Sequence, residues 1–286
     1  MATNYYYFVT GLPDLLLDEG KLSTTCVDFA EEAQLNLTAD DWLRFNLFQL
    51  PFDNANLVGL LDKKEHGFDR RGSIDETALS AGLKMPFELP EYMQDFLGAY
   101  REGRSPHPGL SAADQLAWYF YEAMTNHENE FIREWHTFDL HLRNILVAVA
   151  CRRNLQHIDA LATDRDPAAS MIVIGRDEVA ETILRSSAPD FGLSARLPWV
   201  ERLLGLLKSK LIDFEKGIDS LRWDMLNDMT VATHFRAETV YAFYIKLTIV
   251  ERWRALDPVA GKERLDKLLE ELGASYNVEG IHEHQG

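Results

Sequence analysis

The chain is poor in cysteine and in basic residues, and both shortages exclude classes of function. Only two cysteines, Cys26 and Cys151, occur among 286 residues, and no C-x-x-C pair is present. Two distant thiols favour buried, reduced cysteines over a disulfide framework or a cysteine-based metal site. Lysine and arginine number 29 against 46 acidic residues, a formal net charge of −17. We therefore expect no nucleic-acid binding and no adhesion to anionic lipid; the charge suits a basic protein partner or simple solubility.

Long apolar runs and a secretory leader are also missing. The longest apolar run, Ile145 to Cys151, has seven residues, whereas a membrane-spanning helix needs about 20. The first residues carry no basic segment followed by an apolar stretch and a cleavage site. We expect a cytoplasmic protein without direct membrane insertion, whose link to a membrane goes through another protein.

The sequence contains none of the common catalytic motifs. It lacks the phosphate-binding loop G-x-x-x-x-G-K-[ST], the dinucleotide motif G-x-G-x-x-G and the nucleophile elbow G-x-S-x-G. Asp190-Phe191-Gly192 matches three letters of the kinase pattern, but the other kinase motifs are absent. We therefore predict a protein that is not an enzyme and needs no cofactor.

Helical periodicity dominates the chain, so we predict a mainly all-α fold of helical bundles. The central segments are 112–154 and 213–256, and the helix over 235–256 carries apolar residues on two faces, which indicates burial. Residues 5–9 predict a short N-terminal strand, and residues 171–175 fit either a short strand or a buried turn. Two prolines and two glycines in 102–110 mark a linker between an N-terminal helical region, 1–103, and a helical core region, 111–273, packed as one body.

Histidine and carboxylate residues supply the one candidate for metal chemistry. His127, Glu134 and His141 are seven residues apart and so share a helix face, and His234 with Glu238 stands at i, i+4. Histidine and carboxylate on neighbouring helices can bind zinc or a di-iron pair. The E-x-x-H signature of di-iron bundles is absent there and occurs only at Glu279–His282. The favoured interpretation is a solvated face with local ion pairs, and the alternative is a metal-dependent helical-bundle enzyme.

A second group of polar residues lies beside the apolar stripes of the two long segments. Because unpaired buried charges are costly, we expect these side chains to form a paired interior network. They are Arg143, Asn144, Lys246, Glu251 and Arg252.

The order of several segments resembles a bacterial family of uncharacterised proteins encoded with V-type ATPase subunits. The similarity covers nearly the whole chain, and its strength lies in the order of the segments, since no single motif is chemically diagnostic. The segments are Tyr6–Asp14, Phe52–Leu57, Arg71–Gly72, Phe96–Tyr100, Glu134–Trp135, Asn144–Ala148, Val173–Gly175 with Glu178–Ala180, Asp190–Ser194, Leu221–Trp223 and Ile249–Trp253.

This resemblance implies a role like that of the C subunit of V-type ATP synthase, the d subunit of the eukaryotic enzyme. That subunit is a non-catalytic bowl of helical bundles that seats the central shaft on the membrane ring. The implied function is a coupling or assembly subunit at the inner membrane, with central-stalk subunits and the proteolipid ring as partners. An assembly chaperone of the ATPase is a further alternative. Charges near helix ends give Arg152, Arg153, Asp190 and Arg254 as candidate partner contacts.

Overall fold

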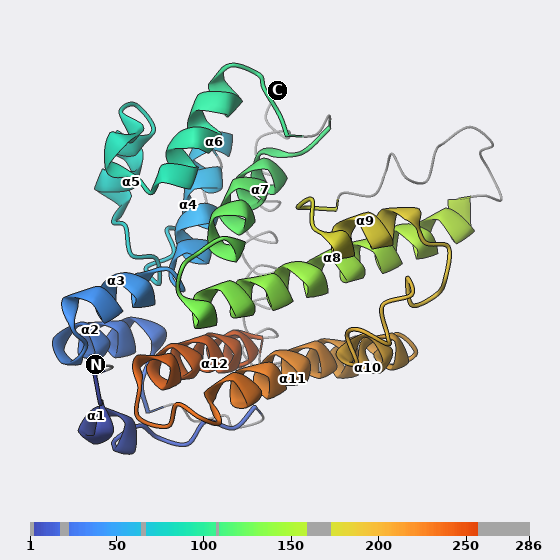
Figure 1. The fold of residues 1–286 in the computed structure, drawn as a ribbon. Coiled ribbons are helices and arrows are strands. Elements are labelled where there is room, and N and C mark those ends of the chain that lie inside the picture. The colour runs from blue at the N-terminus through green and yellow to red at the C-terminus, as the bar shows by residue number, and fades with distance from the viewer. Residues whose placement is uncertain (1–2, 18–22, 64–66, 107–108, 159–172, 257–286) are drawn as a thin grey trace, which may run out of the picture.

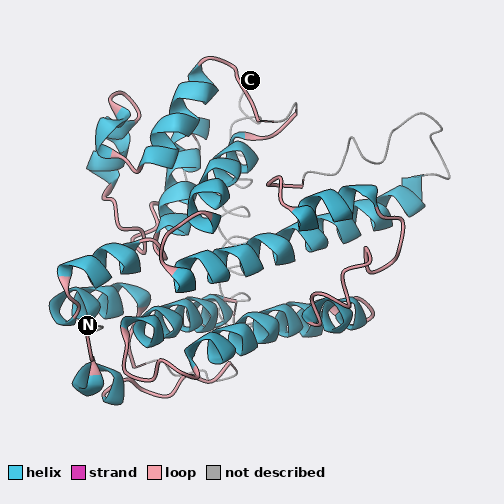
Figure 2. Ribbon diagram, viewed as in Figure 1, coloured by secondary structure: helices cyan, strands magenta, loops and turns pink. Residues whose placement is uncertain are grey.

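The protein is all-helical wherever the structure describes it. The computed structural model describes residues 3–17, 23–63, 67–106, 109–158 and 173–256, and these contain twelve α-helices, one 3₁₀ helix and no strand (Figure 2). This confirms the predicted fold class. The helices are α1 (Tyr6–Thr10), α2 (Cys26–Asn36), α3 (Ala39–Asn46), α4 (Leu50–Asp62), α5 (Glu76–Gly82), η1 (Pro86–Glu88), α6 (Glu91–Arg101), α7 (Ala112–Thr125), α8 (Glu130–Ile158), α9 (Glu178–Arg185), α10 (Trp199–Leu206), α11 (Leu211–Thr230) and α12 (Ala237–Ala255).

Helix α8 is the longest element, with 29 residues, and it organises the others. In Figure 1 it crosses the molecule, with α4 to α7 rising on one side and α11 and α12 running along the other. Helices α7, α9 and α11 pack directly against it. Helices of the two predicted regions contact each other, because α4 and α6 pack on α7 and α2 packs on α12. None of the described helices combines the length and the hydropathy that a membrane span requires.

Helix α12 lies at the centre of the core, as its two apolar stripes predict. Ten of its residues are buried, among them Tyr241 and Tyr244. Phe45 packs against Tyr244 with ring centroids 4.8 Å apart, and Phe29 packs against Phe243 at 4.7 Å. Helices α2 and α3 therefore cover one side of α12 with aromatic side chains, whose large apolar area makes a strong contribution to core stability.

The strand predicted over residues 5–9 is wrong, because this segment forms helix α1. Tyr5, Phe8 and Val9 turn toward the core, whereas Tyr6 and Tyr7 are exposed. Burial at i, i+3 and i+4 is the helical period, whereas a strand would bury alternate residues. The short apolar run fits both patterns, and tertiary contacts select the helix.

Side chains cap the starts of several helices. Thr38 caps α3, accepting a hydrogen bond from the amide of Asp41 at 3.3 Å. That helix ends at Asn46, and Pro51 lies in the first turn of α4. Asp75 caps α5.

Two loops are held by asparagine side chains that act as substitutes for backbone partners. The Asn144 amide donates to the carbonyl of Ile174 at 2.7 Å and accepts from its N–H at 2.9 Å. Asn56 does the same for Asp69, with both distances 2.9 Å. Residues 173–175 therefore form a loop and not a strand, with Ile174 buried and Gly175 at a φ of +90°. Residues 171–172 and the part of the predicted helical core region after residue 256 lie outside the described residues.

A cleft between five helices

A cleft of about 740 Å³ lies between α4, α7, α8, α11 and α12. Each helix contributes one face to it, as the spacing of the lining residues shows. On α8 the lining residues include His136, Asp139 and Arg143, at i, i+3 and i+7, and Trp135 beside them. On α12 they include Ile245, Ile249 and Arg252, again at helical spacing. The cleft therefore arises where five helical faces meet without filling the space between them.

Aromatic side chains line the cleft around one buried histidine. His136 is 2 % exposed and stacks on Phe48 with ring centroids 5.8 Å apart and an interplanar angle of 11°. Phe120 meets the same imidazole edge-on at 5.2 Å. Neither ring nitrogen has a hydrogen-bond partner. Burial lowers the pKa of His136 to about 4, because the charged form would lose its hydration, so the imidazole is neutral at pH 7.

Arginine side chains tie the walls of the cleft together. Arg222 of α11 bonds to Asp139 of α8 at 3.3 Å and to Asp219 of its own helix at 3.2 Å. Arg252 of α12 also contacts Asp219, which accepts a further hydrogen bond from the indole of Trp253 at 2.6 Å. Asp219 is 1 % exposed, and a buried carboxylate requires such partners. Arg252 thus joins α11 to α12, and Arg222 joins α11 to Asp139 of α8.

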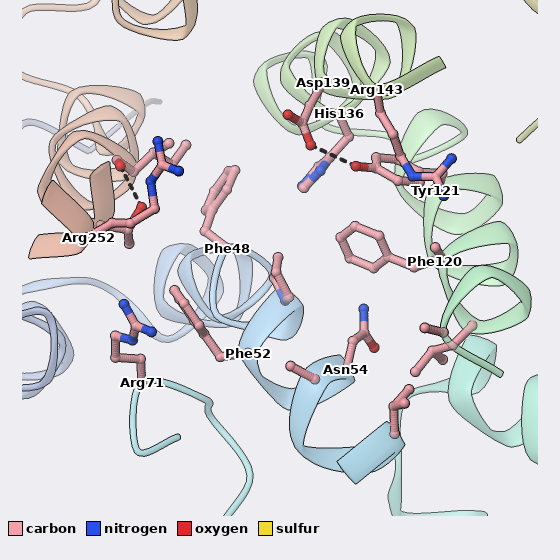
Figure 3. Close-up of a pocket in the computed structure, with 18 of the residues that line it drawn as sticks. Phe48, Phe52, Asn54, Arg71, Phe120, Tyr121, His136, Asp139, Arg143 and Arg252 are labelled. Carbon is pink, nitrogen blue, oxygen red and sulfur yellow. Dashed lines mark hydrogen bonds between the residues drawn. The ribbon is translucent and has the colours of Figure 1, made fainter. Parts of the chain in front are cut away.

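Helix α7 joins this network through Tyr121, and a separate ion pair lies in the loop after α4. The hydroxyl of Tyr121 donates to Asp139 at 2.7 Å (Figure 3), and Arg143 reaches Asp114 at the start of α7 at 2.7 Å. At the other end, Arg71 pairs with Asp69 at 2.6 Å and stands 4.2 Å from the ring centroid of Phe52. Each arginine of the cleft is thus held by at least one carboxylate.

This geometry favours binding over covalent chemistry. Asp139 and Asp219 accept hydrogen bonds from arginine, so they orient cations rather than stand ready as bases. Burial raises the pKa of the Tyr121 hydroxyl, and its neighbour Asp139 raises it further, so the phenol keeps its proton. The cleft offers apolar surface, neutral imidazole and fixed cationic groups.

A comparison with protein families identifies the family of this chain. The family described as "Protein of unknown function (DUF2764)" matches residues 1–275. The chain belongs to this family. No curated protein and no solved structure matches the chain.

In this DUF2764 family member, the five candidate metal ligands lie apart. Three of them are polar residues of the α7–α8 region: His127 lies in the loop before α8, Glu134 is exposed on α8, and His141 is buried, with its Nε2 2.6 Å from Asp177 Oδ2. His234 is exposed and Glu238 borders a separate small pocket. No group of three or more histidine, cysteine, aspartate or glutamate side chains within the described residues could hold a metal ion. His127 does not share a helix face with Glu134 and His141, because α8 begins only at Glu130.

The four candidate partner contacts differ in their exposure and in the groups they contact. Arg152 donates to the carbonyls of Ala188 at 2.6 Å and of Ser186, and lies 3.9 Å from the ring centroid of Phe191. Asp190 accepts from the amide of Gly192 at 3.0 Å, which lowers its pKa. These two residues therefore shape the loop after α9. Arg254 is exposed in the last turn of α12, and the side chain of Arg153 lies outside the described residues.

Each of the five residues expected in an interior network has a partner among the described residues, but the contacts are separate rather than one network. Arg143, Asn144 and Arg252 have the partners given above. Lys246 donates to Asn227 at 2.6 Å, and Glu251 accepts from the amide of Cys26 at 3.1 Å. The sequence pattern missed His136 as a site residue, although its spacing from Asp139 and Arg143 was the available signal.

Proposed function

We propose that this chain is a non-catalytic coupling or assembly subunit of a bacterial V-type ATPase, linking the central stalk to the membrane ring. The observation that carries the proposal is the ordered set of segments, from Tyr6–Asp14 to Ile249–Trp253, that resembles a family encoded with V-type ATPase subunits. The all-helical fold agrees with the helical bundles that this role implies.

The cross-tied helices support a mechanical role. Asp139 and Asp219 connect four helices, because Tyr121, Arg222 and Arg252 converge on them from α7, α11 and α12. Such a network resists sliding of one helix past another, because each shift would leave a buried charge without its partner. A body that carries torque between a shaft and a ring needs this lateral stiffness.

An exposed aromatic cluster at the α1 end of the molecule is the surface we assign to a stalk partner. Tyr7 is 90 % exposed, and Tyr6 packs against Tyr7 and Phe235 with ring centroids 5.6 and 4.9 Å apart. Val231, between α11 and α12, is also exposed. Single exposed apolar residues are ordinary, whereas a contiguous cluster is typical of a protein contact. The acidic surface would steer a basic partner toward it.

Affinity purification from native membranes tests this proposal. We expect stoichiometric recovery with central-stalk and ring subunits, and lower recovery at high salt. Binding to free subunits, without the assembled enzyme, would assign the assembly role. Recovery of the chain alone would contradict both.

A matched pair of variants tests the docking surface. Tyr7→Ser removes the most exposed ring of the cluster and should reduce recovery of the partners. Phe87→Ser removes another exposed ring, on η1, and should leave recovery unchanged. Equal recovery with both variants would show that the partner contacts another part of the molecule.

A further inference from the structure

Three polar atoms at the cleft lack partners within the protein. They are both ring nitrogens of His136 and the Nη1 atom of Arg143, all of them buried. The two residues lie seven positions apart on one face of α8, and both line the cleft (Figure 3). Buried polar atoms are nearly always hydrogen-bonded. These atoms therefore point to a partner that comes from outside the chain.

The unpartnered atoms select the chemistry of that partner. A neutral imidazole offers one donor and one acceptor, and a guanidinium offers donors only. The carboxylate of Asp139 already accepts hydrogen bonds from Tyr121 and Arg222. Free donors thus outnumber free acceptors beside His136 and Arg143. A ligand group with several accepting oxygens satisfies them best, and an anionic one gains a charge-assisted bond from arginine.

The other residues that line the cleft indicate the non-ionic part of a ligand that would fit it. Phe48, Phe52, Phe120, Ile245 and Ile249 present aromatic and aliphatic surface to the cleft. Its volume of about 740 Å³ falls within the range of roughly 300–1,000 Å³ typical of small-molecule sites. An apolar body of drug-like size therefore fits beside the two donor side chains.

We propose that this cleft binds a small amphipathic anion. Its carboxylate, sulfonate or phosphate group accepts hydrogen bonds from His136 and from Nη1 of Arg143, and its aromatic or alkyl body packs against Phe48, Phe52 and Phe120. Four arginines and three aspartates line the cleft, so its lining carries a small excess of positive charge within an acidic protein. The site is separate from the exposed aromatic cluster and does not depend on the proposed coupling role.

Two fluorescent probes of similar apolar character test the proposal on the full chain. Anilinonaphthalene sulfonate is anionic, and N-phenyl-1-naphthylamine is uncharged. We expect the sulfonate to bind one saturable site. Arg143→Gln should weaken it about tenfold, the loss of one charge-assisted hydrogen bond, and should change binding of the uncharged probe less than about twofold. Equal effects on both probes, or none on either, would overturn the anionic assignment.

A steric block tests the location. Ala117 lines the cleft from α7, so Ala117→Phe should abolish binding of the sulfonate. Ala78→Phe introduces the same ring at an exposed position on α5 and should have no effect. Binding that survives Ala117→Phe would place the probe elsewhere and refute the site. His136→Phe removes one donor without releasing any partner, so it serves as the variant least prone to misfolding and should also weaken the sulfonate.

Competition with laurate and with 2-naphthoate identifies the body of the natural ligand. Displacement by laurate alone indicates an alkyl chain, and displacement by 2-naphthoate alone indicates an aromatic system. Failure of both carboxylates to displace the sulfonate would exclude a carboxylate as the anionic group, and failure of dodecyl phosphate as well would overturn the proposal. None of these results depends on whether the chain co-purifies with an ATPase.

Discussion

Replacing His136 by phenylalanine should change both the stability of the protein and its dependence on pH. The imidazole is 2 % exposed and its two nitrogens have no partner. Phenylalanine keeps an aromatic ring against Phe48 and Phe120 and removes both polar atoms. Each unsatisfied buried polar group costs about 1–3 kcal/mol, so His136→Phe should raise the free energy of unfolding at pH 7 by about 1–3 kcal/mol.

The pH dependence follows from the lowered pKa of His136. Below the ordinary histidine pKa of about 6.5, the unfolded chain takes up a proton at this position. The native state does not do so until about pH 4. The unfolded state therefore binds more protons in this window, and stability falls as pH falls through it. At about 1.4 kcal/mol per pH unit, the interval from pH 6.5 down to pH 4 removes at most about 3.5 kcal/mol of stability.

Urea unfolding, followed by circular dichroism and tryptophan fluorescence at several pH values from 7 to 4.5, measures both effects. The variant should lack the part of the acid destabilisation that comes from His136, so the gap between the two proteins should widen as pH falls. His234→Phe replaces an exposed histidine and should stay within about 0.5 kcal/mol of the wild type at pH 7. A gap between wild type and His136→Phe that stays constant with pH would refute the buried neutral imidazole.

Two further substitutions test how the loops are held. Gly72→Ala should destabilise the protein by about 2 kcal/mol in thermal or urea unfolding, because an added Cβ would stand 2.2 Å from Oδ1 of the buried Asp53. Gly98→Ala, on α6, meets no atom within 4 Å and should instead stabilise by about 0.5–1 kcal/mol. Asn144→Ala should cost about 2–4 kcal/mol, since it frees the buried N–H and C=O of Ile174; hydrogen exchange at that amide should rise selectively, and unchanged exchange would contradict the clamp.

The burial of Asp53 shows how a local motif can mislead. Ser73 and Glu76 match a capping box, yet Ser73 donates its hydroxyl to Asp53 at 2.9 Å and Asp75 caps the helix instead. Asp53 also accepts from the amides of Ser73 and Ile74, at 3.0 and 3.1 Å. The Ser73 hydroxyl therefore bonds to a carboxylate distant in sequence instead of capping the helix. The spacing of residues along the chain does not reveal this contact.

The sequence by itself determined the helical class, most helix positions and the need for a paired interior network. These properties depend on the 3.6-residue period, on caps within four residues and on the cost of unpaired charge, all of which are local. The buried helix α12 and the cap of α7 at Ser111 follow directly from them. The resemblance to an uncharacterised bacterial family encoded with V-type ATPase subunits suggested a function to test, not a site.

Only the tertiary structure determines where the five helix faces meet and that a cleft remains between them. His136, Asp139 and Arg143 have the same helical spacing as many solvated triads, and nothing local to α8 indicates that Phe48 and Phe120 enclose the imidazole. The short apolar run at Tyr5 likewise became a helix through distant contacts, including a hydrogen bond from its amide to the carbonyl of Phe235 at 2.7 Å. Burial is a property of the assembled chain, because it depends on which surfaces exclude water together, and only the fold specifies those surfaces.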